Sequence, residues 1–143
     1  MAGNITGVLN RIQTRQGRPG VAEMVLTCTA HTDGSYPVTV INTLVKSSSF
    51  DIQGLKLYSV KSIPDATKPP TDASDLTILD EYGIDLLGGK GADFIRAASK
   101  TWTLVGPVGY NAPALITGDV TVNITNNNGD GAIVTLVLEL TGD

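Results

Sequence analysis

Residues 120–140 carry the pattern that most restricts the fold. In residues 120–125, and again in residues 133–140, apolar side chains recur at every second position. A period of two is that of a β-strand, whose successive side chains point to opposite faces. The turn-forming residues 126–131 lie between the two runs, so we expect a hairpin. The second run is also apolar at Val137, on its other face, which predicts a central or interface strand.

The composition favours strands over helices throughout. The chain has 17 threonines, 13 valines and 11 isoleucines, and 16 glycines separate the apolar runs. β-Branched side chains lose rotamer freedom in a helix and pack well on a pleated surface. At 143 residues the chain has the size of one domain and can bury a core without disulfides. We expect an all-β protein, an antiparallel β-sandwich of six to eight strands.

Further strands are expected before the C-terminal pair. They cover residues 21–30, 38–45, 52–63 and 101–105. The first presents Met24, Leu26, Cys28 and Ala30 to one face. Asp33-Gly34 is a hairpin signal between the first two strands. The many β-branched residues in 38–45 argue against a helix there, and Gly54 predicts a bulge or bend within 52–63.

The stretch Asp75–Ile95 organises the rest of the chain. It reads as a strand at residues 76–79, an acidic turn at 80–83 and a glycine corner at 88–91. A proline-rich loop, residues 64–74, precedes it and cannot be a central strand, because proline lacks the N–H of a ladder bond.

The glycine corner does not have the spacing of a phosphate-binding loop. Such a loop needs a glycine, four residues and then Gly-Lys-Ser/Thr, whereas Lys90 is followed by Gly91 here. No parallel βαβ pattern surrounds it. We therefore interpret the corner as a conformational feature.

Three carboxylates cluster in the acidic turn. Asp80, Glu81 and Asp85 are oxygen ligands of the kind that calcium prefers, although they lack the alternating spacing of a dedicated loop. The sequence leaves open whether the turn binds a cation. Asp80 and Glu81 are not expected to act as an acid/base pair, because adjacent residues of a strand point to opposite faces.

No nucleophile and base are expected to converge. His31 lies in a turn and is expected to be exposed, while Cys28 lies in a strand and is expected to be a buried small hydrophobe. A single cysteine excludes an internal disulfide and disfavours a cysteine-based metal site. We expect no enzyme activity, no metal and no cofactor.

The first twenty residues differ from the remainder in charge. They hold Arg11, Arg15 and Arg18 without a carboxylate, a charge of +3, whereas residues 21–143 carry −7. We expect residues 1–20 to form an extended, loosely held basic arm, with an edge strand at 5–12, on a single domain of residues 21–143. The three arginines are candidate contacts to an acidic partner surface. They are too few to predict nucleic-acid binding.

The sequence shows neither a signal peptide nor an apolar run of about 18 residues that would span a membrane. We therefore expect synthesis and folding in a cytoplasm-like compartment. The aromatic residues are scattered, but three of them would suit a sugar-binding platform: Tyr82, Trp102 and Tyr110.

Residues 50–143 resemble a known family. The segments GLKLYSVKSIPD, PPTDASDLTILDEYGIDLLGGKGADFI and GDVTVNITNNNGDGAIVTLVLEL are similar to the jelly-roll cement, or decoration, proteins of tailed bacteriophages. The most specific part is the proline-rich loop followed by the pattern D-[LV]-T-[IL]-x-D-E-x-G-[IV]-D-L-L-G-G.

The resemblance implies a jelly-roll sandwich without catalysis or cofactor. Proteins of this family lie on the outside of the phage head, bind several copies of the major capsid protein, often as dimers or trimers, and stabilise the shell. It implies a virion protein that is made in the bacterial host cytoplasm. Two alternatives stay open: a carbohydrate-binding or adhesin module, and a tail-associated virion protein.

Overall fold

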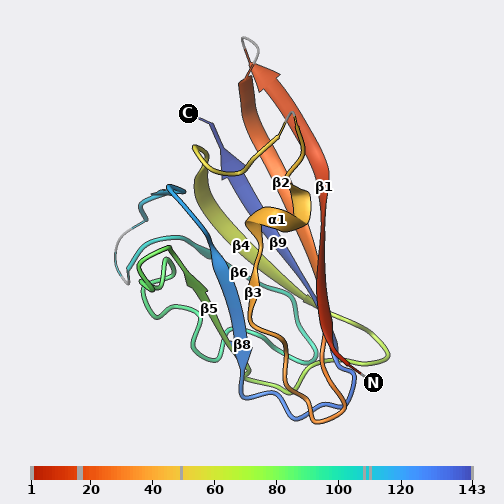
Figure 1. Cartoon of the computed structure of the whole chain (residues 1–143). Coiled ribbons are helices and arrows are strands. Elements are labelled where there is room, and N and C mark those ends of the chain that lie inside the picture. The colour runs from red at the N-terminus through yellow and green to blue at the C-terminus, as the bar shows by residue number, and fades with distance from the viewer. Residues whose placement is uncertain (1, 16–17, 49, 108, 110, 143) are drawn as a thin grey trace.

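Two antiparallel sheets pack face to face in a computed structural model of the chain (Figure 1). The structure describes residues 2–15, 18–48, 50–107, 109 and 111–142, without the side chains of residues 11–19. The larger sheet has the order β1-β2-β9-β4-β6, with β7 also paired to β4. Its strands are β1 (Asn4–Arg15), β2 (Arg18–Thr29), β4 (Lys56–Pro64), β6 (Thr101–Leu104), β7 (Ala114–Leu115) and β9 (Ile133–Thr141). The smaller sheet, of order β3-β8-β5, contains β3 (Thr39–Val40), β5 (Asp75–Leu79) and β8 (Thr121–Thr125).

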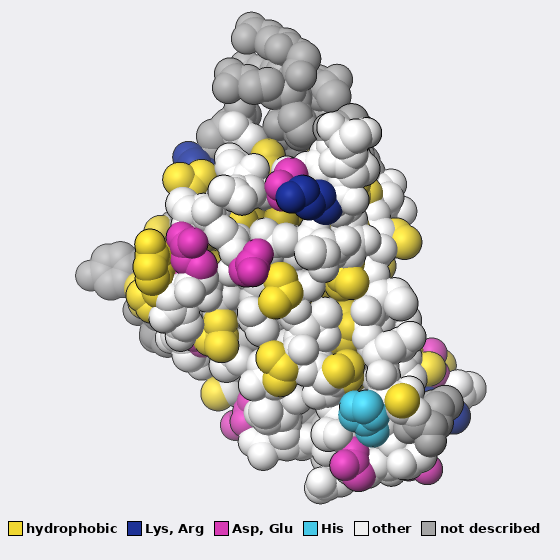
Figure 2. All heavy atoms as spheres, viewed as in Figure 1, with side chains coloured by type: hydrophobic (Ala, Val, Ile, Leu, Met, Phe, Trp, Pro, Cys, Tyr) yellow, Lys and Arg dark blue, Asp and Glu magenta, His cyan; other side chains and the backbone are white. Residues whose placement is uncertain are grey.

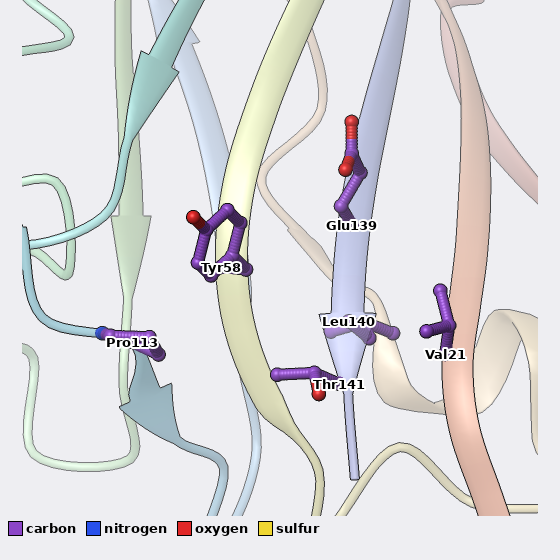
Figure 3. A pocket seen from close by; sticks show the side chains of 6 residues that line it. All are labelled: Val21, Tyr58, Pro113, Glu139, Leu140 and Thr141. Carbon is purple, nitrogen blue, oxygen red and sulfur yellow. The ribbon is translucent and has the colours of Figure 1, made fainter. Parts of the chain in front are cut away.

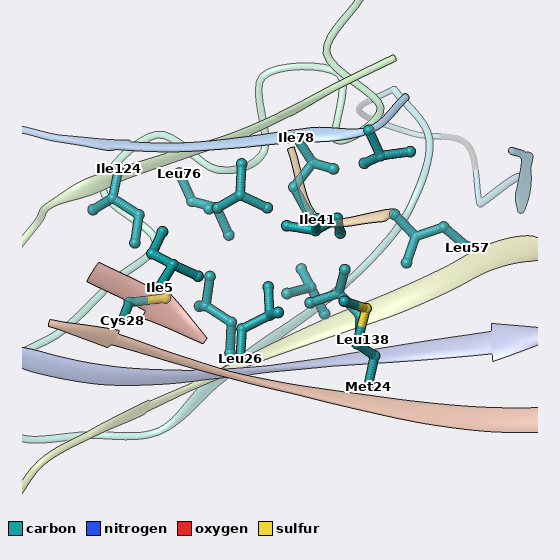
Figure 4. Close-up of a cluster of buried hydrophobic side chains, with 14 of the residues drawn as sticks. Ile5, Met24, Leu26, Cys28, Ile41, Leu57, Leu76, Ile78, Ile124 and Leu138 are labelled. Carbon is teal, nitrogen blue, oxygen red and sulfur yellow. The ribbon is translucent and has the colours of Figure 1, made fainter. Parts of the chain in front are cut away.

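The core lies between the two sheets (Figure 4). The six-stranded sheet contributes Met24, Leu26 and Leu138, and the three-stranded sheet contributes Ile78 and Ile124, all buried. Each strand alternates buried and less buried residues, as its sequence pattern predicts. The all-β sandwich is therefore confirmed, and β9 is the central strand that its two apolar faces predicted.

The two expected hairpins are wrong. β8 and β9 lie in different sheets, and so do β2 and β3, so residues 126–131 and 30–38 carry the chain across the sandwich. An alternating pattern fixes which side chains share a face but does not select the neighbouring strand. At the crossing, the Asn127 amide nitrogen donates to Gly34 O over 2.6 Å and its oxygen accepts from Thr71 N over 2.7 Å. These bonds join three loops at one end of the sandwich.

Successive strands from β2 to β6 alternate between the sheets, and β8 and β9 repeat the alternation. A jelly roll, which has eight strands in two sheets, requires such crossings. The smaller sheet has three strands among the described residues, so the jelly roll stays a prediction.

The strand expected at residues 38–45 is wrong for most of its length. Only β3 is extended, and it is followed by a single helical turn, α1 (Asn42–Val45). Asn42 is the cause, because its buried side chain replaces strand pairing: its oxygen accepts from Val120 N over 2.7 Å, and its nitrogen donates to Gly118 O over 3.0 Å. The strand expected at 52–63 likewise begins only at β4, after a turn in which Gly54 has a φ of +96°.

The N-terminal segment is a strand rather than a loosely held arm. β1 pairs with β2 from Asn4↔Thr29 onward, and Ile5 is buried in the core. The edge strand expected at residues 5–12 is confirmed, whereas the expectation of a loose arm is wrong over β1, and the boundary placed after residue 20 falls inside β2. Pairing of β2 with β9 begins at Val21↔Thr141, so the β1–β2 hairpin extends beyond the rest of the sheet (Figure 1).

Candidate interaction surfaces

The outer face of the six-stranded sheet carries a row of apolar side chains. The register aligns Val8 with Val25, Val25 with Val137, Val137 with Lys61, and Lys61 with Trp102. Residues in register lie side by side on one face, and the neighbouring positions, including Met24 and Leu138, point into the core. At the two ends of the row Val8 is 61% exposed and Trp102 is 56% exposed. We call Val8, Val25, Val137 and Trp102 the apolar row.

A pocket adjoins the apolar row, where β9 lies between β2 and β4 (Figure 3). It has a volume of about 380 Å³ and a mainly apolar lining: Val21, Tyr58, Pro113, Glu139, Leu140 and Thr141. The β4–β9 register shifts between Leu57 and Ser59, so Tyr58 occupies an irregular position of the ladder and is 46% exposed. We call this cavity the β4–β9 pocket.

One ion pair separates the pocket from the row. Lys61 Nζ lies 2.7 Å from Glu139 Oε1, and both side chains are partly exposed. Exposed pairs of this kind contribute only about 0–1 kcal/mol. The pair therefore fixes side-chain positions and neutralises Glu139 more than it stabilises the fold.

The carboxylates of the acidic turn hold the loop together. Asp80 Oδ1 accepts hydrogen bonds from Tyr82 N and Ile84 N, both over 2.9 Å. Asp85 accepts from Ile78 N, Leu87 N and Gly89 N, at 3.0–3.2 Å. Glu81 Oε1 accepts from the Thr117 hydroxyl over 2.7 Å. The three carboxylates thus have separate structural partners, and Asp80 and Glu81 do not converge on one point.

No group of three or more His, Cys, Asp or Glu residues is placed to hold a metal ion within the described ranges. The carboxylates instead fix the loop that presents Tyr82 and Ile84, which are 80% and 61% exposed. Large apolar side chains on a fixed loop are typical of protein contacts. We call residues 80–85 the acidic knob.

The glycine corner is a packing feature. A Cβ on Gly91 would lie 1.8 Å from Leu76 O, and a Cβ on Gly88 would lie 2.4 Å from Pro107 Cα. Gly88 also has a φ of +60°, which side-chain-bearing residues rarely adopt. The backbone of the corner therefore lies directly against β5 and the loop at 106–107, which agrees with a conformational role.

His31 and Cys28 both serve the fold. His31 Nδ1 accepts a hydrogen bond from Gly3 N over 2.7 Å, so the ring is partly buried against the N-terminus rather than exposed as expected. Cys28 is fully buried, as expected, and burial raises the pKa of its thiol to about 12. A thiol of this kind is not a nucleophile at neutral pH.

The candidate arginines lie on the projecting hairpin. In backbone register Arg11 pairs with Glu23, and Arg15 pairs with Arg18. The side chains of all three lie outside the description, so their role as partner contacts stays a prediction. Acidic side chains are spread over the face seen in Figure 2, with few Lys or Arg side chains among them.

The proposed sugar platform is not assembled as expected. Tyr82 follows β5 of the smaller sheet, Trp102 lies in β6 of the larger sheet, and Tyr110 lies outside the described residues. Sequence reasoning missed Val8, Val21, Tyr58 and Ile84 as surface residues. The signal was present in β2, where Val21 and Val25 add apolar residues to the face opposite Met24 and Leu26.

The fold and these surfaces define an antiparallel β-sandwich with exposed apolar side chains on one sheet face and one loop. No family model matches the sequence, and no curated protein matches it. Among solved structures, the chain is similar to a chain of the cyanophage Pam1 capsid asymmetric unit, with 11% identity and a TM-score of 0.39 over 98% of this chain and 86% of that one. A likeness at this level does not define a common fold. Within the described part of the chain, no helix is long and apolar enough to cross a membrane.

Proposed function

We propose that this chain is a virion structural protein that binds the outer surface of an icosahedral phage head and stabilises the shell of major capsid protein. The apolar row on the outer sheet face carries the proposal. Val8 and Trp102 are more than half exposed, which gives no benefit to an isolated sandwich but suits a surface that is covered by another protein. The resemblance of residues 50–143 to cement proteins supports a capsid as that partner.

The proposal is of a non-catalytic protein that needs no cofactor. His31, Asp80 and Glu81 each have a structural hydrogen-bond partner, and Cys28 is buried. Binding would occur through sheet and loop surfaces. A single standard interface buries about 1,200–2,000 Å², and the symmetry of a shell multiplies its effect.

Density-gradient sedimentation of source lysate tests the proposal. We expect the chain to travel with DNA-filled heads and with tailless heads alike. Migration only with tailed particles or detached tails would identify a tail protein instead, and a free peak of the chain would contradict a virion role.

Paired variants test the apolar row itself. We expect Trp102→Ala to weaken binding of the purified chain to stripped heads by about tenfold or more, because exposed Trp residues dominate many interfaces. Val8→Ala should weaken it less, and Val38→Ala is the matched control, since Val38 is 65% exposed and precedes β3 of the other sheet. Equal binding by Trp102→Ala and the unmodified chain would exclude the row as the capsid contact.

Carbohydrate binding is the second candidate, favoured by the exposed ring of Trp102 on a sheet face. Binding to a glycan array that is lost in folded Trp102→Ala, together with a free peak on the gradient, would favour it over the cement function.

A further inference from the structure

The acidic knob presents two apolar side chains in a fixed geometry. Tyr82 and Ile84 are strongly exposed, and one carboxylate oxygen of Asp80 binds the backbone N–H of both. Asp80 N also donates to Ile84 O over 2.9 Å, and Gly83 N donates to Asp80 O over 3.0 Å. A loop that is already ordered loses little conformational entropy on binding, so it can act as an anchor.

The charge around the knob defines what would receive it. Residues 69–89 contain Asp72, Asp75, Asp80, Glu81 and Asp85 and no Lys or Arg. A complementary surface has an apolar cavity for Tyr82 with cationic side chains beside it. An anionic membrane surface does not fit, because it would repel these carboxylates.

The chain itself carries a surface of this kind at the β4–β9 pocket. The cavity of about 380 Å³ falls in the range of pockets that enclose a ligand group, and Val21, Tyr58 and Leu140 make its lining apolar. Lys56 aligns with Thr141 at one side, and Lys61 contacts Glu139 at another. The basic N-terminal sequence, with its charge of +3, ends next to Val21.

The knob of one molecule does not reach its own pocket. The knob follows β5 of the three-stranded sheet, whereas the pocket opens on the outer side of the six-stranded sheet, with the core between them. Contact between the two surfaces therefore needs two copies.

We propose that the acidic knob of one copy inserts Tyr82 and Ile84 into the β4–β9 pocket of a second copy. This contact joins two different surfaces, so each copy keeps a free knob or pocket for a further neighbour, and the assembly is a ring or an open row. One such contact is smaller than a standard interface, so it is weak in free solution and strengthened where copies are held side by side. The inference does not depend on the proposed capsid function.

Sedimentation equilibrium of the purified chain, over a range of concentrations, tests this contact. We expect concentration-dependent association that Tyr82→Ala weakens by about tenfold or more, as for an aromatic anchor. Val21→Trp, which fills the pocket from its rim, should weaken it similarly. Trp102→Ala is the matched control, an exposed aromatic outside knob and pocket, and should associate like the unmodified chain.

The double variant Tyr82→Ala/Val21→Trp provides the decisive comparison. If the two residues meet across the contact, the double variant associates no more weakly than either single variant. Additive losses, or unchanged association in either single variant, would overturn the proposal. A chain that is monomeric at all concentrations would also overturn it, whatever its behaviour with phage heads. Far-ultraviolet circular dichroism confirms that each variant is folded.

Discussion

Buried polar side chains are treated differently in β4 and in the loops of the three-stranded side. Ser59 and Ser62 in β4 are fully buried, and their hydroxyls have no hydrogen-bond partner within the described structure. Asn42 and Asn127 are also buried, yet each uses both ends of its amide. The difference shows that the six-stranded sheet is held by its ladders and apolar packing, whereas the opposite side depends on individual side-chain hydrogen bonds.

Removal of the Asn127 amide should give the largest effect. Asn127→Ala leaves Gly34 O and Thr71 N without their partners at the crossing of three loops. Loss of a partner from a buried polar group costs about 1–3 kcal/mol, so we expect the free energy of unfolding in urea to fall by that amount. Unchanged stability would break the comparison, because the loops would then not rely on this side chain.

Removal of the Ser62 hydroxyl should have a smaller effect of opposite sign. Ser62→Ala deletes a buried donor without a partner, so we expect the free energy of unfolding to rise by up to about 1 kcal/mol or to stay unchanged. The same urea titration measures it. A fall of more than about 1 kcal/mol would show that the hydroxyl is bonded, for example to a bound water.

Acid should weaken the loops slightly. Hydrogen bonds from the Ser35 hydroxyl and backbone lower the pKa of Asp33, and hydrogen bonds from Lys68 N and from Thr67 lower the pKa of Asp65. Because both pKa values are lower in the folded state, their contribution to stability is present above the model value of 3.8 and is lost as the pH falls through the folded values. Both groups are fully exposed, so the effect is small.

Thermal unfolding between pH 2 and pH 7 measures this contribution. Asp65→Asn should remove part of the pH dependence below about pH 4 and leave the dependence at higher pH unchanged. Identical curves for the two proteins would show that the turn at Asp65 does not contribute.

Much of the fold follows from the sequence, because a period of two identifies strands whatever their partners are. β2, β5, β8 and β9 were predicted close to their observed positions for this reason. Sheet membership was not predictable from the same pattern, and the two expected hairpins failed on it. The helical turn after β3 was missed because its cause is a long-range bond from Asn42 to residues 118 and 120.

The candidate surfaces were predictable only in part. The acidic turn was recognised, but the sequence did not show that Asp80 and Asp85 bind backbone N–H groups and so present Tyr82 and Ile84. The apolar row combines residues from four strands, and its existence depends on register. Register between distant strands is set by the whole packed structure rather than by any single segment.

The central position of β9 has a consequence for biosynthesis. The strand that joins β2 to β4 is the last of the nine to leave the ribosome, so the larger sheet cannot close until it has emerged. Until then β2 and β4 each lack a neighbour, and the nascent chain exposes two apolar strand edges. A sheet built from such distant segments forms slowly, and its solubility during synthesis rests on the β1–β2 hairpin, which is the first paired unit to form.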